Sequence, residues 1–547
     1  MQRSRLLTCA FLGGCLGLAS AQTNVWTQHN DSARNGWNAL ESTLTPSNVN
    51  SATFGKVFQK ALDGVVDAQP LYADGIAIPN QGTHDVLIVA TENASMYALD
   101  AESGAVLWQT TALQAGETPS DDHNCGQVSP AIGITSTPVF NSPNSPALVY
   151  FVAMSKDASG KYHQRLHAVD IATGHEQLGG PVEIQAQFPG TGDNSQGGQV
   201  IFAPGQYVAR AGLLMGTNGV VYIGWSSHCD QRPYTGWLMG YSGTTLAQVS
   251  VLNLTPNGSE GSIWGSGGGL AQDTVTGDIY VLDANGTFDP TLNSNGFPVR
   301  GDFGNGFLKI STANNQLAVA DYFNMWNTVA ESNADEDLGS GGTMLLPNLR
   351  DSKGHVWHLG VGAGKDANIY LANRDNMGKF NPANNNGLYQ EVTGALGGPV
   401  FSMPAYFNGR VYYGAVGDSI KAFSMAGARL STAPVSQTAH QFPYPGATPS
   451  ISSNGTTSAI LWAVENTSPA VLHAYLANNL AVELYTSLQN PSRDNFGGGN
   501  KFMTPTIVNG HVYVGTPNGV AAFGLLAPAA PSKPSLTAYA SGRSGRH

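Results

Sequence analysis

The chain has 547 residues, of which 41% are hydrophobic, 11% are charged and 67 are glycine. This apolar content excludes a globally disordered chain, and the charged share is less than half of the roughly one quarter that is usual in globular proteins. Acidic residues outnumber basic ones by 37 to 25, and the resulting net charge of −12 excludes a basic nucleic-acid-binding surface. A chain so rich in glycine and so poor in charge is typical of a turn-rich β protein.

The N-terminus has the organisation of an export signal. A start with two arginines precedes an apolar stretch at residues 6–18 and a small-residue cleavage site at residues 19–21. We expect cleavage after Ala21 and a periplasmic or secreted protein, with a lipid anchor on Cys15 as the alternative. No other apolar stretch reaches the roughly 18 residues of a membrane span.

Removal of this leader leaves two cysteines, Cys125 and Cys229. In an exported chain two cysteines most simply form one disulfide, and two buried free thiols are the alternative. The sequence contains no Cys-x-x-Cys-His motif for covalent haem and no four-cysteine zinc set.

A short apolar strand recurs along the chain. Its copies lie at residues 86–89, 149–152, 220–223, 279–282, 357–360, 411–414, 460–463 and 512–515. A proline-containing strand precedes several copies, and a further strand, a glycine-containing turn and an outer strand follow. Four strands per unit, returning every ~50 residues or more, are typical of the blades of a β-propeller.

The repeats predict an all-β protein folded as an eight-bladed β-propeller of four-stranded antiparallel blades, with seven blades as the alternative. The last unit, residues 503–526, stops one strand short. Residues 54–60 can supply its outer strand and close the ring without open edges. We therefore divide the mature chain into an N-terminal extension (22–53), the propeller (54–526) and a disordered tail rich in Pro, Ser and Gly (527–547).

The turns before the outer strands share a motif. Residues 98–104 and 168–174 both read Ala-x-Asp-x-x-Ser/Thr-Gly, and the first copy precedes Trp108. This pattern resembles the repeat of pyrroloquinoline quinone (PQQ) propellers, the quinoprotein alcohol dehydrogenase-like superfamily, over about residues 54–526. The resemblance implies the propeller fold, PQQ and calcium as cofactors, and oxidation of an alcohol or a sugar with transfer of electrons to a separate acceptor.

The resemblance also assigns residues to a cofactor site. Trp264, in Ile-Trp-Gly, corresponds to the indole that forms the floor under the cofactor, and indole suits the stacking of a planar quinone. Asp230, after a Ser-Ser pair, and Asn285, in Asp-Ala-Asn-Gly, correspond to calcium ligands. Hard oxygen ligands suit calcium, although that family has Glu at the place of Asp230.

The acidic cluster at residues 335–337 corresponds to the position of the catalytic base. By the resemblance, Asp337 takes the hydroxyl proton of the substrate, and Asp335 and Asp337 both serve as metal ligands. Lys365 and Arg374 keep the spacing of the two cations that contact the cofactor. Lys365 and calcium would both polarise a quinone carbonyl.

Besides Asp230 in place of Glu, three further features differ from the family pattern. A lone Cys125 stands where that family has two adjacent cysteines over the cofactor, and a Cys125–Cys229 bridge across the pocket mouth would take their place. Glycines follow Trp264 where that family has aromatic residues. The arginine that clamps a cofactor carboxylate has two candidates, Arg210 and Arg232.

Each of these residues also has a purely structural explanation. Trp264 can fill a contact between blades, and Asn285 is a good turn residue. Lys365 can pair with Asp366 at the surface, and the acidic cluster can cap a loop. Two other functions therefore stay open: a cofactor-free propeller that binds protein or polysaccharide, and a polysaccharide lyase or hydrolase on the same fold. We expect a monomer with no nucleic-acid partner.

Overall fold

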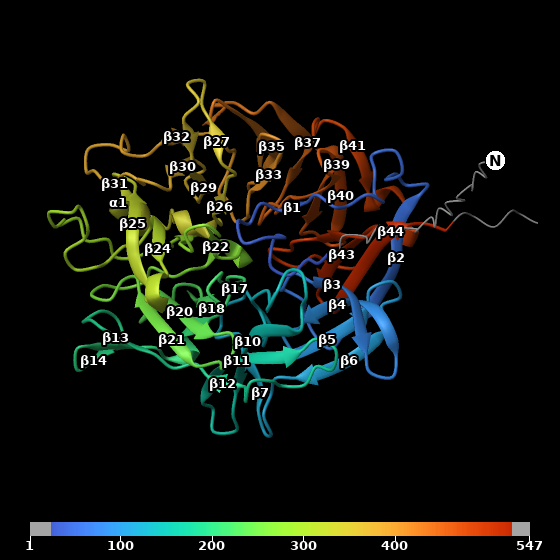
Figure 1. The fold of residues 1–547 in the computed structure, drawn as a ribbon, viewed down its shortest axis with the longest axis horizontal. Helices are drawn as coiled ribbons and strands as arrows, with labels where there is room; N and C mark the ends of the chain where they lie inside the picture. The colour runs from blue at the N-terminus through green and yellow to red at the C-terminus, as the bar shows by residue number, and fades with distance from the viewer. Residues whose placement is uncertain (1–22, 528–547) are drawn as a thin grey trace, which may run out of the picture.

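The computed structural model describes residues 23–527, so the predicted leader and nearly all of the predicted tail lie outside the described residues. Short β-strands arranged as a ring of sheets make up this part of the chain (Figure 1). Helices are few and short, the α-helices being α1 (Thr328–Asn333) and α2 (Pro491–Asp494). Within these residues, no helix is long and apolar enough to cross a membrane.

Eight sheets of four or more strands form the ring within residues 23–527. The first sheet holds β3 (Leu71–Ile78), β4 (Gly82–Ala90), β5 (Ser95–Asp100) and β6 (Val106–Thr111). The second holds β7 (Thr118–Asp121), β8 (Ala131–Ile132), β9 (Val139–Phe140), β10 (Leu148–Lys156), β11 (Tyr162–Asp170) and β12 (Val182–Glu183). The third holds β17 (Leu214–Met215), β18 (Val220–Gly224), β20 (Trp237–Ser242) and β21 (Gln248–Asn253). The fourth holds β22 (Ala271–Gln272), β23 (Ile279–Leu282), β24 (Gly306–Ser311), β25 (Ala318–Asn324) and β31 (Lys379–Phe380).

The remaining four sheets continue around the ring. The fifth holds β26 (Met344–Leu345), β29 (Leu359–Ala363), β30 (Ile369–Asn373) and β32 (Gln390–Val392). The sixth holds β33 (Ala405–Phe407), β34 (Arg410–Tyr413), β35 (Asp418–Ala426), β36 (Arg429–Leu430) and β37 (Ser436–Phe442). The seventh holds β1 (Trp37–Asn38), β38 (Ser450–Asn454), β39 (Thr457–Glu465), β40 (Val471–Leu476) and β41 (Glu483–Thr486). The eighth holds β2 (Phe54–Ala61), β42 (Thr506–Val508), β43 (His511–Thr516) and β44 (Gly519–Leu525).

Smaller sheets lie outside this ring of eight. They contain β13 (Gln187–Pro189), β14 (Ser195–Gln196), β15 (Gln199–Ile201), β16 (Tyr207–Val208), β19 (Ser226–Ser227), β27 (Leu349–Arg350) and β28 (Val356–Trp357).

The predicted repeat strands lie in eight different sheets, each between two antiparallel neighbours. They are β4, β10, β18, β23, β29, β34, β39 and β43. The fifth copy starts later than predicted, at Leu359, because Trp357 pairs with Leu349 in the separate β27–β28 hairpin. The recurring apolar runs in the sequence therefore identified the right strands, although the start of the fifth repeat strand was misplaced.

The ring closes through its two ends, as predicted. β2 pairs antiparallel with β44, from Phe54 opposite Leu525 to Ala61 opposite Gly519. An outer strand that precedes the first sheet in the chain thus completes the last one. This pairing covers the edge that β44 would otherwise expose.

The repeated turn motif has a packing role. Asp170 Oδ1 accepts bonds from the backbone N–H and the hydroxyl of Thr173, and Gly174 has a φ of +71°. A Cβ on Gly174 would lie 2.5 Å from the Trp108 ring, which belongs to the outer strand of the preceding sheet. Phe58 occupies the equivalent place, 2.7 Å from a Cβ on Gly104. Each turn glycine therefore makes room for an aromatic ring of the neighbouring sheet.

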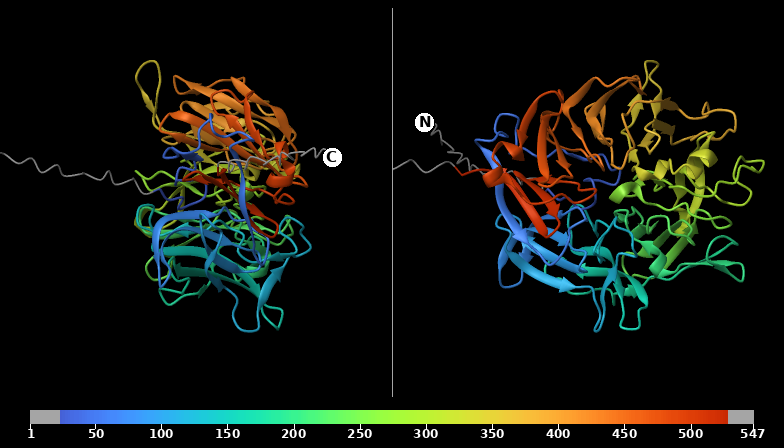
Figure 2. Two further views of the ribbon diagram at one scale, coloured as in Figure 1. Left: turned by 90° about the vertical axis from the view of Figure 1, so that its right-hand side faces the viewer. Right: turned by 180° about the vertical axis from the view of Figure 1, so that it is seen from behind.

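The N-terminal segment before β2 is part of the ring rather than an appendage. In Figures 1 and 2 this segment, in blue, runs across the ring. Arg34 is fully buried in it and donates to the carbonyls of Leu270 and Leu213. Backbone hydrogen bonds join the segment to sheets all round the ring, at Tyr72, Phe140, Gln272, Leu345, Tyr406 and Ile451. Residues 23–53 thus tie the sheets together from inside.

Candidate functional site

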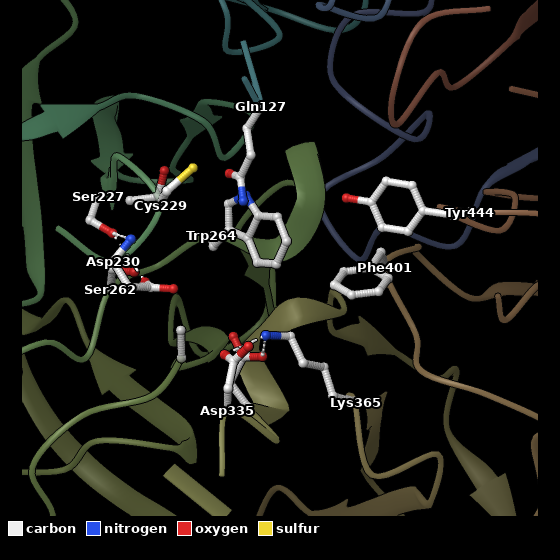
Figure 3. A pocket seen from close by; sticks show the side chains of 13 residues that line it. Gln127, Ser227, Cys229, Asp230, Ser262, Trp264, Asp335, Lys365, Phe401 and Tyr444 are labelled. Carbon is white, nitrogen blue, oxygen red and sulfur yellow. Dashed lines mark hydrogen bonds and ion pairs between the residues drawn. The ribbon is translucent and has the colours of Figure 1, made fainter. Parts of the chain in front are cut away.

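A cavity of about 270 Å³ collects five of the residues that the sequence assigns to a site. They are Asp230, Trp264, Asp335, Asp337 and Lys365 (Figure 3). All five lie in loops that connect or extend the third, fourth and fifth sheets. The loops at one region of the ring therefore gather the predicted acid, cation and indole groups into one place.

Lys365 lies between two carboxylates. Its Nζ is 2.6 Å from Asp335 Oδ1 and 3.0 Å from Asp337 Oδ1. The turn between β29 and β30 carries Lys365, and its backbone N–H donates to the Asp337 carbonyl. Burial acts to lower the pKa of Lys365, but Asp337 and Asp335 together raise it. Lys365 is therefore a cation at neutral pH.

Asp337 is the buried carboxylate of the cavity, with 4% of its surface exposed. Burial raises the pKa of Asp337 to about 7, against the opposing attraction of Lys365. A carboxylate whose pKa lies near the working pH can both accept and return a proton. Asp335 differs, since 68% of its side chain is exposed. Asp337 is thus better suited to proton transfer than its neighbour.

Asp230 is held in a strained turn that follows β19. Cys229 and Asp230 both have positive φ, +49° and +53°. The hydroxyl groups of Ser227 and Tyr234 donate to Asp230 Oδ1, at 3.2 and 2.8 Å. These bonds fix the carboxylate at the cavity wall.

Asn285 adds an oxygen atom with no partner. Its Nδ2 donates to Asp335 Oδ1 at 2.8 Å, which fixes the orientation of the amide. Its Oδ1 is buried and has no hydrogen-bond partner within residues 23–527. A buried carbonyl oxygen without a donor is costly unless a cation or water satisfies it.

Trp264 and the disulfide form another part of the wall. Trp264 meets Phe401 and Phe502 edge-on, with interplanar angles of 69° and 87°, so neither ring stacks on the indole. Cys125 and Cys229 form a disulfide, and Cys229 lines the cavity. The predicted bridge is confirmed, and the alternative of two free thiols is wrong.

Arg374 does not reach the cavity. Lys365 precedes β30 and Arg374 follows it, so the two cations lie at opposite ends of one strand. The Arg374 guanidinium lies 2.5 Å from Asp273 Oδ2 and 5.9 Å from the Tyr280 ring centre. Arg374 therefore lies outside the cavity that Lys365 lines, and its place among the cofactor contacts stays a prediction.

No protein-family model matches this sequence, and no curated protein matches it either. Among solved structures, the chain is similar to the quinohemoprotein alcohol dehydrogenase from Comamonas testosteroni, with 13% identity, a TM-score of 0.61, and coverage of 93% of this chain and 81% of that one. It is also similar to the quinohemoprotein alcohol dehydrogenase ADHIIG from Pseudomonas putida HK5, with 14% identity, a TM-score of 0.59, and coverage of 92% and 80%. A europium-containing methanol dehydrogenase matches with 12% identity, a TM-score of 0.57, and coverage of 92% and 98%. The chain has the propeller fold of the quinoprotein alcohol dehydrogenases.

In this quinoprotein-type propeller, sequence reasoning missed several side chains of the site. Gln127, Phe401 and Tyr444 line the cavity, and no motif marks them. Gln127 follows closely on Cys125, and that proximity is the one signal that could have found it. Arg210 is buried and its Nη2 has no hydrogen-bond partner within residues 23–527.

A further carboxyl group lies beside the site. Asp283 is fully buried, and neither of its oxygens has a hydrogen-bond partner within residues 23–527. Burial, together with the charge of Asp337, raises the pKa of Asp283 well above its ordinary value. The surroundings of Asp283 therefore favour its neutral form over the carboxylate.

Proposed function

We propose that this chain is an exported dehydrogenase that uses PQQ and calcium to oxidise a small alcohol or sugar. The observation that carries the proposal is the single cavity in which Asp230, Trp264, Asp337 and Lys365 meet, although long stretches of chain separate them. The fold similarity to two quinohemoprotein alcohol dehydrogenases supports it at the level of architecture. We also propose that the eight larger sheets are eight blades of one propeller.

The oxygen atoms around the cavity fit a calcium ion. Asp230, Asp335 and Asp337 line the cavity and offer carboxylates. Asn285 does not line it but bonds Asp335, and it offers an amide oxygen that has no hydrogen-bond partner within residues 23–527. Calcium takes about six to eight oxygen ligands, so the cofactor and water would complete the set. Three carboxylates also suit a trivalent ion, and one protein of similar fold is a europium-containing methanol dehydrogenase. A lanthanide ion is therefore a variant of the same proposal.

The other side chains fit a planar, anionic quinone. Trp264 meets Phe401 and Phe502 at steep angles, so neither of these rings stacks in parallel on the indole, as a planar quinone would. Arg210 and Trp264 line one small space beside the main cavity, and the Arg210 Nη2, which has no hydrogen-bond partner within residues 23–527, suits a cofactor carboxylate. The volume of about 270 Å³ lies near the lower end of small-molecule pockets, ~300–1,000 Å³.

When bound, PQQ would supply the two-electron redox chemistry of the reaction. Asp337 accepts the hydroxyl proton of the substrate, because its pKa is near neutrality and its Oδ1 borders Lys365. Lys365 stabilises negative charge that develops next to it. Asp335 holds the Lys365 ammonium and the Asn285 amide in position, since Asp335 Oδ1 contacts both.

The remaining parts of the proposal concern location and partners. A disulfide fits an oxidising compartment outside the cytoplasm, in agreement with the predicted leader. The sequence has no covalent haem motif, so electrons would pass to a separate acceptor protein or dye. We propose a monomer that acts on a small alcohol or sugar.

Calorimetry of the purified mature protein with PQQ, with and without calcium, tests the proposal. We expect calcium-dependent binding at micromolar or better affinity, at least 10-fold weaker in Trp264→Ala. Trp326→Ala is the matched control, because Trp326 is 53% exposed and does not line the cavity. Absence of PQQ binding, or equal binding by Trp264→Ala, would overturn the proposal.

One observation favours a different function, a cofactor-free propeller that binds protein or glycan. Lys365 already neutralises Asp335 and Asp337 by direct contact, so the site is partly charge-compensated without a cofactor. A protein that does not bind PQQ but whose loops retain a glycan or an envelope protein would establish this alternative. Cleavage of a polysaccharide that is lost in Asp337→Ala would instead establish a lyase or hydrolase.

A further inference from the structure

Two histidines and a glutamate converge where the sixth and seventh sheets meet. His440 comes from β37 of the sixth sheet, whereas Glu465 ends β39 and His473 lies in β40 of the seventh. Within residues 23–527, these three side chains each offer one ligand atom, and the atoms lie within 4.8 Å of one another. None of the three lines the cavity of the proposed dehydrogenase site.

The distances fit a common ion. Glu465 Oε2 is 2.9 Å from His440 Nε2 and 3.2 Å from His473 Nε2. Zinc bound tetrahedrally at about 2.0–2.2 Å from each ligand separates the ligand atoms by about 3.3–3.5 Å. The two contacts of Glu465 would need to lengthen by only a few tenths of an ångström, and the two imidazoles, which are stacked with ring centres 4.9 Å apart, would need to turn so that both Nε2 atoms face one ion.

A second carboxylate orients the buried imidazole. His473 Nδ1 is 2.8 Å from Glu483 Oε1 and 3.2 Å from the Tyr475 hydroxyl. A histidine that donates Nδ1–H to a carboxylate presents the lone pair of Nε2, and this arrangement is common for histidines that bind metals. That lone pair then faces the Glu465 carboxylate, so either a proton on Nε2 or a metal ion must lie between the two groups.

Two of the three side chains are buried, and the third is partly exposed to solvent. Glu465 and His473 are 8% and 3% exposed, while 40% of the His440 side chain is exposed. Two ligands are thus preorganised in the seventh sheet, and the third approaches from the solvent side of the sixth. Such a set leaves a coordination position for water or an outside ligand.

We propose that His440, Glu465 and His473 bind a divalent transition-metal ion of the zinc class, with Glu483 as a positioning residue. The ion would join the sixth and seventh sheets, because its ligands come from both. Imidazole and carboxylate ligands suit zinc and its neighbours in the first transition row better than calcium. The site is independent of the proposed dehydrogenase function.

Titration of the chelator-treated mature protein with Zn²⁺ and Co²⁺ tests the proposal. We expect one equivalent of Zn²⁺ to bind by calorimetry and Co²⁺ to give the visible absorption of a four- or five-coordinate ion. His440→Gln should weaken Zn²⁺ binding at least 100-fold, and it should fold because His440 is partly exposed. Glu483→Gln should weaken it about 10–100-fold, as expected for a group that orients a ligand.

Two controls make the result specific. His163 also lies between two carboxylates, Glu183 at 2.8 Å and Asp157 at 3.4 Å, but has no second histidine, so His163→Gln should leave Zn²⁺ binding unchanged. Asp337→Asn should also leave it unchanged, because Asp337 belongs to the other cavity. Two results would overturn the proposal: wild-type protein that binds no Zn²⁺, or equal Zn²⁺ binding by the wild type and by His440→Gln. Glu465 would then only accept hydrogen bonds from protonated imidazoles.

Discussion

Lys365 Nζ lies 3.0 Å from Asp337 Oδ1, and the backbone N–H of Lys365 donates to the Asp337 carbonyl at 3.0 Å. Lys365 therefore contacts Asp337 twice, once through its main chain and once through its side chain. The main-chain hydrogen bond holds the Lys365 turn in place, so the ion pair does not need to order that turn. Because the pair is held in place, its charges are available for chemistry without further ordering of the loop.

The first prediction concerns this pair. Asp337→Asn removes the proton acceptor while keeping the shape, so PQQ-dependent oxidation of alcohols or sugars should fall about 10²–10⁴-fold. PQQ affinity, measured by calorimetry, should change much less than the rate. Asp418→Asn is the control, because Asp418 forms a similar 2.8 Å pair with Lys421 outside the cavity. Unchanged oxidation in Asp337→Asn would exclude this residue as the base.

Much of the fold could be predicted because the sheets depend on local patterns. The repeat strands have continuous apolar runs, and the two Ala-x-Asp-x-x-Ser/Thr-Gly turns mark the ends of the next strands, β5 and β11. The sequence places residues 54–60 as the outer strand of the last unit, and the structure puts Phe58 of that strand over Gly104 as it puts Trp108 over Gly174. Patterns of this kind are local, so they can be recognised in a single sequence without knowledge of the contacts between distant loops.

The parts that could not be predicted depend on contacts between distant loops. Arg34 bonds the carbonyl of Leu270 across the ring, and nothing near Arg34 in the sequence indicates that partner. Phe401 and Tyr444 enter the cavity from loops without a motif. Arg374 does not line the cavity, and its spacing from Lys365 in the sequence does not show which end of the strand faces the cavity. Long-range packing, not local preference, decides such positions.

A second prediction concerns the disulfide. Cys125 and Cys229 are 104 residues apart in the chain, so their bridge removes much of the entropy of the unfolded state. Replacing both with Ser should lower the free energy of unfolding by about 4–5 kcal/mol on the loop-entropy account. Urea denaturation of the double variant and of the oxidised wild type measures this difference. A wild-type sample treated with reductant should approach the variant, and equal stability of all samples would contradict the prediction.

A third prediction separates two ways in which alanine destabilises a turn glycine position, backbone strain and steric clash. Gly219 has a φ of +74° and open space where a Cβ would lie, so Gly219→Ala should cost about 1–2 kcal/mol from backbone strain alone. Gly174 has a similar φ of +71°, but a Cβ there would also strike the Trp108 ring at 2.5 Å. Gly174→Ala should therefore cost ~1–3 kcal/mol more, measured by urea denaturation. Equal losses would mean that Trp108 moves aside without cost.

The last prediction is a dependence of stability on pH. Burial, with a smaller contribution from Asp366, raises the pKa of Glu331 to about 7. The folded state therefore keeps this proton after the unfolded state has lost it. The contribution of Glu331 to stability is complete below the ordinary glutamate pKa and is lost as the pH rises through about 7.

Glu331→Gln should remove this loss, because a neutral amide keeps the acceptor for the Asn327 side-chain amide at any pH. The variant should gain about 1–3 kcal/mol over the wild type at pH 8 and little at pH 4, a range that allows for partial contact of Glu331 with solvent. Thermal unfolding at both pH values measures the difference. Glu102→Gln, at an exposed position 3.7 Å from His511, is the comparison and should change the pH dependence much less than Glu331→Gln. A wild type and a Glu331→Gln variant with parallel pH profiles would show that Glu331 is already ionised in the folded protein.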